Sequence, residues 1–100
     1  MWNQLFLFIF FLGLFTSGYA QVLSDEELDT CYIYKTIEKA SKTPDAVYVL
    51  DLTKSKLKTF PLEILKFKNL NILKMGKNKI SSVPEGISQL LFLQELDLGK

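Results

Sequence analysis

Residues 70–84 read LNILKMGKNKISSVP, and the same spacing of apolar residues occurs twice more in this chain. Leu70 and Leu93 stand 23 residues apart, and a shift of that length in either direction aligns the chain with itself without an insertion. Upstream, Val47, Leu50, Leu52, Leu57, Phe60 and Pro61 match Leu70, Leu73, Met75, Ile80, Val83 and Pro84; downstream, Leu93, Leu96 and Leu98 match the first three. A fixed period of this length indicates repeated structural units that stack against one another.

The repeated pattern L-x-x-L-x-L-x-x-N-x-L resembles the leucine-rich repeat. The resemblance is to short repeats of the bacterial-type secreted class with an L-P step, here Phe60-Pro61 and Val83-Pro84, followed by Ile64 and Ile87. It covers residues 46–100. It implies an α/β solenoid in which one short strand per repeat joins a curved parallel sheet, and the convex side is irregular or 3-10 helical. This family binds many unrelated partners, so the resemblance implies a fold rather than a ligand.

The chain divides into three parts: a signal peptide at residues 1–20, an N-terminal helical cap at residues 21–45, and repeats at residues 46–69, 70–92 and 93–100, the last of them partial. Alternating apolar residues predict one strand per repeat, at Leu50/Leu52, Leu73/Met75 and Leu96/Leu98. The next counterpart of Asn78 would fall one position past Lys100, so the third repeat has a strand without a bend. We therefore expect a C-terminally truncated fragment that does not form a stable monomer.

Residues 1–20 are typical of an export signal. The run at residues 5–15 is apolar apart from Gly13, and Gly18 and Ala20 place small side chains where a signal peptidase would cut after Ala20. This segment predicts a secreted, periplasmic or cell-surface location. Its start lacks Lys and Arg, and an uncleaved membrane anchor remains the alternative, although the run is shorter than the ~20 apolar residues of a bilayer span.

Two helix starts precede the repeats. Ser24 with Glu27 forms a capping-box pattern, and Thr36 opens a second helix that ends before Pro44. We expect one or two short helices that cover the open edge and the apolar flank of the first repeat. The candidates to pack there are Tyr32, Tyr34, Ile37 and Ala40. Cys31 is the only cysteine, which excludes an internal disulfide and leaves a packing residue or a free thiol.

Asn78 lies where the chain leaves the strand of the second repeat. Its amide can donate hydrogen bonds to, and accept them from, backbone groups in a bend that has no sheet partners. The family resemblance implies that this residue is buried and stacks with its counterparts as a ladder. Ser55 takes the equivalent place in the first repeat and offers fewer hydrogen bonds, so we expect a less tightly held bend there.

The sequence offers little support for catalysis. The chain has no histidine, which excludes Ser-His-Asp and Cys-His arrangements, and it has no Gly-rich phosphate loop and no zinc-type Cys/His cluster. Asp51 and Asp97 hold equivalent positions two repeats apart, so parallel strands would separate them by about 10 Å. That distance is too wide for a shared proton. We predict a non-enzymatic protein without a cofactor or a metal.

All twelve basic residues are lysines, although the formal net charge is only +1. Between positions 54 and 79 the only acidic residue is Glu63, and the lysines there are Lys54, Lys56, Lys58, Lys66, Lys68, Lys74, Lys77 and Lys79. One interpretation is a patch for an anionic partner, and the other is a set of solvated loop residues. The lack of arginine and of interleaved aromatic residues, and the expected spread over strand, bend and convex side, favour the second.

We expect the repeats to bind a protein or peptide through the concave face of the sheet. No nucleic acid partner is expected, and a membrane would be contacted only through an uncleaved N-terminal segment. The outward strand positions on that face are Val49, Asp51, Thr53, Ile72, Lys74, Gly76, Glu95, Asp97 and Gly99. This mixture of Val, Ile and charges suits a protein better than a sugar polymer. The alternative is a structural part of a longer repeat protein, whose function, including any fused enzyme, lies beyond residue 100.

Overall fold

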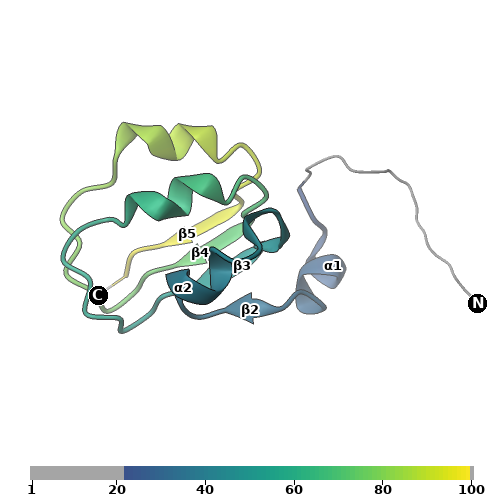
Figure 1. Cartoon of the computed structure of the whole chain (residues 1–100), viewed down its shortest axis with the longest axis horizontal. Coiled ribbons are helices and arrows are strands. Elements are labelled where there is room, and N and C mark those ends of the chain that lie inside the picture. The colour runs from purple at the N-terminus through teal and green to yellow at the C-terminus, as the bar shows by residue number, and fades with distance from the viewer. Residues whose placement is uncertain (1–21, 100) are drawn as a thin grey trace, which may run out of the picture.

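The computed structural model describes residues 22–99, so the predicted signal peptide lies outside the described residues. Its sheet has four parallel strands in the order β2–β3–β4–β5 (Figure 1). The strands are β2 (Ile33–Tyr34), β3 (Val49–Asp51), β4 (Ile72–Lys74) and β5 (Glu95–Asp97). The helical segments are the α-helices α1 (Asp25–Asp29) and α2 (Ile37–Ala40) and the 3-10 helices η1 (Pro44–Ala46), η2 (Leu62–Lys66) and η3 (Glu85–Gln89).

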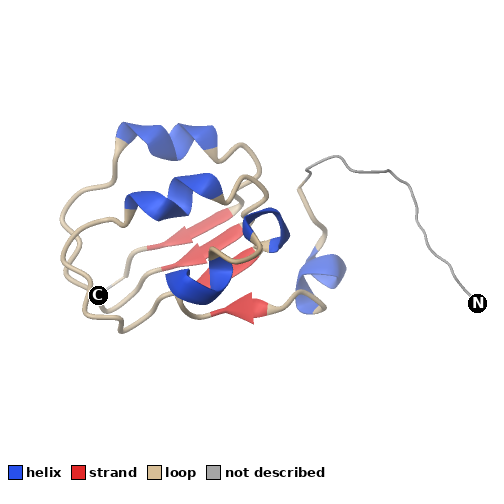
Figure 2. Ribbon diagram, viewed as in Figure 1, coloured by secondary structure: helices blue, strands red, loops and turns tan. Residues whose placement is uncertain are grey.

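The register of the sheet follows the sequence repeat. Leu50 pairs with Leu73, and Leu73 pairs with Leu96, so the partners in β3, β4 and β5 are 23 residues apart. Between successive strands the chain returns on the same side of the sheet, through η2 and then through η3 (Figure 2). This is the α/β repeat architecture that the sequence predicts.

The core lies between the sheet and the 3-10 helices. Leu50, Ile64 and Phe67 are fully buried. Alternate strand residues therefore point into the core, as the two-residue period of a strand requires. Pro61 and Pro84 directly precede η2 and η3, where a residue without an N–H removes no sheet hydrogen bond.

The N-terminal segment contributes a strand that was not predicted from the sequence. β2 pairs with β3 and occupies the edge of the sheet. The two expected helix starts are both present. Ser24 and Glu27 form a reciprocal capping box at the start of α1, with hydrogen bonds of 2.9 and 3.2 Å, and Thr36 caps α2.

Three of the four residues expected to cover the first repeat contact the core. Ala40 is fully buried, and Tyr34 and Ile37 pack against the buried cluster. The expectation for Tyr32 is wrong, because this residue precedes β2 and is 59% exposed. Its ring meets the ring of Tyr34 edge-on, with the centroids 4.7 Å apart.

The apolar side of β5 is more open than that of β4. Leu96 and Leu98 are 39% and 40% exposed, whereas their repeat counterparts Leu73 and Met75 are 0% and 1% exposed. β5 pairs with β4 and, among the described residues, has no strand on its other side. Within residues 22–99, no helix has the length and apolar character needed to cross a membrane.

Candidate functional site

Two rows of side chains cross the open sheet face, which is the face opposite the core. The first, called the apolar row after its three aliphatic members, follows the strand register through Ile33, Val49 and Ile72 and ends at Glu95. The second, the charged row, follows it through Asp51, Lys74 and Asp97. The structure thus places six of the nine predicted face residues in two adjacent rows. Of the other three, Thr53 and Gly99 are exposed just beyond the ends of β3 and β5, whereas Gly76, just beyond β4, is buried rather than exposed.

The apolar row offers less surface at Val49 than the sequence predicts. Val49 is only 5% exposed, because it lies between Ile33 of β2 and Ile72 of β4. Ile33 is 48% exposed and Ile72 is partly exposed. The accessible apolar surface of this row therefore lies at the two isoleucines, one of which belongs to the unpredicted strand.

Charges of opposite sign alternate along the charged row. Lys74 lies between Asp51 and Asp97, and each carboxylate belongs to a neighbouring strand. A side-chain hydrogen bond with Thr53 is the main cause that lowers the pKa of Asp51, and partial burial opposes it. The Thr53 amide and the charges of Lys74 and then Lys35 lower that pKa further. Because Lys35 directly follows β2, the alternation extends to the fourth strand.

Both aspartates also hold the chain where it leaves the strand. The Asp51 carboxylate accepts a hydrogen bond from the Thr53 amide at 3.0 Å, and the Asp97 carboxylate accepts one from the Gly99 amide at 2.8 Å. Such local bonds fix the direction of the side chain. The two carboxylates lie on opposite sides of β4 and do not form an acid–base pair. Within residues 22–99, no group of His, Cys, Asp and Glu is placed to hold a metal ion.

Asn78 connects the bends of two repeats. Its Oδ1 accepts hydrogen bonds from the backbone amides of Ser55 and Leu57, at 2.9 and 3.0 Å. Its Nδ2 donates to three backbone carbonyl oxygens, those of Leu52, Met75 and Gly76, at 2.9, 2.9 and 3.2 Å. The first bend, where Ser55 replaces the asparagine, is therefore held by the asparagine of the next repeat. This arrangement offsets the weakness that the sequence predicts for that bend.

Asn71, which was not predicted as a structural residue, is fully buried directly before β4. Its Oδ1 accepts hydrogen bonds from the Leu23 amide at 2.8 Å and from Nε2 of Gln94 at 2.7 Å. The same Gln94 nitrogen also donates to the Leu23 carbonyl oxygen at 2.7 Å. The N-terminal segment is thereby tied to the second and third repeats. The sequence does contain a signal for this role, since Asn71 is an amide side chain between two apolar residues. A polar side chain buried at such a place needs hydrogen-bond partners and can therefore connect neighbouring segments.

Comparison with known proteins supports this architecture. No protein-family model matches the chain, and no curated protein matches it. The solved structure of a leucine-rich repeat protein of Leptospira interrogans is similar, with a TM-score of 0.51 and 32% sequence identity, and the match covers 69% of this chain. This chain has a leucine-rich-repeat-like fold. It spans 24% of the length of the Leptospira protein.

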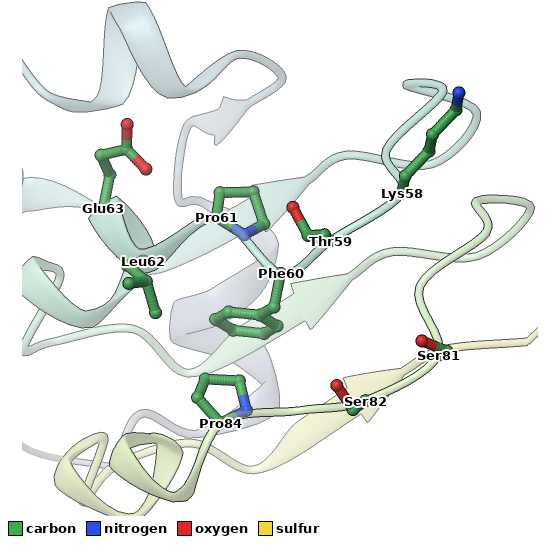
Figure 3. Close-up of a pocket in the computed structure, with 9 residues that line it drawn as sticks. All are labelled: Lys58, Thr59, Phe60, Pro61, Leu62, Glu63, Ser81, Ser82 and Pro84. Carbon is green, nitrogen blue, oxygen red and sulfur yellow. The ribbon is translucent and has the colours of Figure 1, made fainter.

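In this leucine-rich-repeat-like fold, an open cleft of about 520 Å³ lies between the segments that lead into η2 and η3 (Figure 3). Lys58, Thr59, Ser81 and Ser82 supply its polar lining, and Glu63 lies at the end away from Lys58. The cleft was not predicted, because its two walls come from different repeats and neither wall carries a recognisable motif.

Cys31, whose role the sequence left open, is partly buried in the leucine-rich-repeat-like fold. Its thiol donates a hydrogen bond to the Glu27 carbonyl oxygen, with a sulfur–oxygen distance of 3.4 Å. Burial, and then the charge of Glu27, raise the pKa of Cys31. A thiol with a raised pKa stays protonated near neutral pH and is a weak nucleophile.

Proposed function

We propose that this chain is a non-enzymatic binding module that holds a protein or peptide on its open sheet face, the predicted concave face. The observation that carries the proposal is the pair of rows on that face. Exposed Ile33 and partly exposed Ile72 lie beside the alternating charges of Asp51, Lys74 and Asp97. Protein surfaces offer the same combination of apolar and charged groups. The leucine-rich repeat neighbour supports a binding repeat rather than a catalyst.

The charged row gives this face a means of selecting its partner. Because Lys74 lies between two carboxylates, a partner segment with charges of one sign meets repulsion at one position or another. A segment with alternating charges can pair along the whole row. We infer a partner whose charges alternate at the ~4.8 Å spacing of the strands. The apolar side chains of this partner would lie against Ile33 and Ile72.

We further propose that the module acts outside the cytoplasm, secreted, in the periplasm or at the cell surface, after cleavage behind Ala20. The support is the apolar run and the small residues of the predicted signal peptide. N-terminal sequencing of the exported protein should begin at Gln21, and an intact Met1 in a membrane fraction would contradict cleavage. In the same proposal residues 21–45 cap the first repeat, which the pairing of β2 with β3 and the packing of Tyr34 support.

Selection of linear peptides from a displayed random library tests the binding face without a known partner. Peptides that bind the chain should lose binding to the double variant Ile72→Thr, Lys74→Glu. Threonine retains the β-branched shape that a strand favours, so the sheet should persist and the circular dichroism spectrum should be unchanged. The matched control is Leu62→Thr, Lys66→Glu, which likewise replaces one aliphatic residue by threonine and one lysine by glutamate, at exposed positions of η2. Equal binding to both variants would refute the proposed face.

A second candidate function is a structural part of a longer repeat protein. The exposure of Leu96 and Leu98 favours it, since a further apolar layer against β5 would bury both side chains. The test appends, after Lys100, a copy of residues 78–92 and then a copy of residues 70–92, which continues the repeat in register. A higher and sharper thermal transition would support this role, and an unchanged transition would count against it.

A further inference from the structure

Five lysines gather at the edge of the fold where the strands end. This lysine edge consists of Lys54, Lys56, Lys58, Lys77 and Lys79, all of them exposed. They lie on two bends, residues 52–61 and 75–84, which lead from β3 to η2 and from β4 to η3. Neither bend contains Asp or Glu. From the sequence, we expect the lysines to be spread over strand, bend and convex side. The structure instead brings these five together at one edge.

The two bends lie side by side. The Lys54 amide donates to the Gly76 carbonyl oxygen at 3.0 Å, and the Lys79 amide donates to the Leu57 carbonyl oxygen at 2.8 Å. In the repeat register, Lys54 and Lys56 have lysines as their counterparts in the second bend. The backbones that carry these lysine pairs are thus stacked at the ~4.8 Å strand spacing. Like charges held on neighbouring strands repel one another, and this repulsion disfavours the folded state.

Three of these lysines also have an unfavourable backbone conformation. Lys54, Lys56 and Lys77 each have a φ of 59°, and no other non-glycine residue in the range 22–99 has a positive φ. Glycine or asparagine adopts this left-handed conformation at a lower cost. Backbone strain and charge repulsion therefore coincide at one edge. Strain that is concentrated at one place in a fold points to a function for the side chains held there.

An acidic helix lies at the opposite end of the sheet. α1 lies near the starts of the strands, whereas the two bends lie at their far ends (Figure 1). The acidic residues of α1 are Asp25, Glu26, Glu27 and Asp29. Charged residues of both signs also lie elsewhere, because Asp51 and Asp97 end β3 and β5 beside the two bends, and Lys66 and Lys68 precede the start of β4. With the acidic α1 at one end and the lysine edge at the other, the orientation in which the lysine edge faces an anionic surface is favoured.

We propose that the lysine edge docks this protein onto an anionic phospholipid surface. Lysine ammonium groups are mobile point charges, and headgroup phosphates demand no fixed donor geometry. None of the large exposed apolar residues lies on the two bends, so the edge lacks the apolar anchor that a protein partner would use. The chain has no arginine, and the one aromatic residue of the bends, Phe60, is 7% exposed, which disfavours nucleic acid.

The cleft beside Lys58 adds hydrogen-bonding groups to this edge. The hydroxyl residues Thr59, Ser81 and Ser82 line the cleft on the same side as Lys58 (Figure 3). In Figure 3 the Lys58 ammonium points away from Ser81 and Ser82, and after a change of rotamer it could join the hydroxyl groups in holding phosphate oxygens through charge-assisted hydrogen bonds. Because the Glu63 carboxylate lies at the other end of the cleft, a headgroup phosphate would bind at the Lys58 end.

The test measures the partitioning of the whole chain into phosphatidylcholine vesicles with and without phosphatidylglycerol, at about 0.1 M salt. Because the apolar residues 1–20 would bind any bilayer, the readout is the ratio of the two partition coefficients. The double variant Lys54→Asn, Lys77→Asn should lower this ratio about 25-fold, at about fivefold per lysine. Its thermal midpoint should stay the same or rise, since asparagine tolerates the left-handed conformation better than lysine.

The matched control is Lys66→Asn, Lys68→Asn, which removes the same charge from exposed positions in and just after η2. The control should leave the ratio nearly unchanged. If both double variants lower the ratio equally, net charge explains the binding and the proposal is overturned. It is also overturned if the unmodified chain shows no preference for phosphatidylglycerol. Binding to a polyglutamate peptide without that preference would assign the lysine edge to an acidic protein instead.

Discussion

Replacing Asn78 by alanine should destabilise the fold by detaching the bends of two repeats from each other. The amide side chain makes five hydrogen bonds with the backbone, at distances between 2.9 and 3.2 Å. Alanine removes the partner of the Ser55 and Leu57 amides and of three carbonyl oxygens.

The expected loss of stability can be worked out from these contacts. A hydrogen bond contributes about 1 kcal/mol net on average, and more when a buried group is left without a partner. The Ser55 amide is exposed, so water can replace its partner, whereas the other four bonds are partly buried. Partial access of water to those four groups reduces their total of about 4 kcal/mol, and we expect a loss of about 2–3 kcal/mol. That is a large share of the roughly 5–15 kcal/mol that holds a typical domain together.

Urea unfolding, followed by far-ultraviolet circular dichroism at a fixed protein concentration, measures this loss. Asn78→Asp should destabilise at least as much, because it keeps the acceptor but turns a carboxylate toward three carbonyl oxygens. The control is Asn69→Ala, which removes a single exposed hydrogen bond to the Asp45 carbonyl oxygen and should cost less than about 0.5 kcal/mol. A value for Asn78→Ala as small as that of the control would refute the reasoning.

Three further substitutions test other contacts. Thr53→Val should raise the pKa of Asp51 toward its ordinary value of 3.8, as a carboxyl NMR titration would show. Because that pKa is lowered in the fold, the stabilisation by Asp51 is complete above about pH 4 and is lost as the pH falls through the folded value. Asn71→Ala should speed hydrogen exchange at the Leu23 amide, which loses its 2.8 Å acceptor. Leu73→Ala should cost about 3 kcal/mol or more in urea unfolding, since Leu73 is fully buried.

Each of these substitutions has a control that isolates its cause. Lys74→Gln should shift the pKa of Asp51 less than the threonine change does, because the lysine charge is a smaller cause. Gln94→Ala leaves the hydrogen bond between Leu23 and Asn71 in place, so exchange at Leu23 should accelerate less. Leu91→Ala, at a position that is 76% exposed, should change stability by less than about 0.5 kcal/mol. A reversed order in any pair would contradict the contact on which that prediction rests.

The repeats were predictable because their apolar spacing is regular. The positions of Leu50, Leu73 and Leu96 predict the observed strand register, since a slip by one residue would turn every core residue outward. β2 could not be predicted in this way. A strand of two residues has no period, and its pairing with β3 depends on the fold of the intervening chain.

The sequence predicted which residues lie on the open sheet face, but not how accessible each of them is to solvent. Alternation along the strands placed Asp51, Lys74 and Asp97 on one face, which the register then brought into one row. Val49 is buried between Ile72 and Ile33, and Ile33 belongs to the strand that the sequence did not reveal. A lysine patch was one of two interpretations of the sequence, and the sequence favoured the other, because the lysines alternate with other residue types along each bend and only the stacking of the two bends brings five of them together.

Asn78 also links the stability of the fold to the proposed lipid contact. Its Oδ1 holds the Ser55 amide, which lies between Lys54 and Lys56, two of the residues with a left-handed backbone. These hydrogen bonds therefore help to offset the strain of the bends that carry the charges. Asn78→Ala leaves all five lysines in the chain, yet it should lower the preference for phosphatidylglycerol vesicles as well as the stability. If stability falls while that preference stays the same, the vesicles respond to lysine content alone, and the arrangement of the bends has no part in binding.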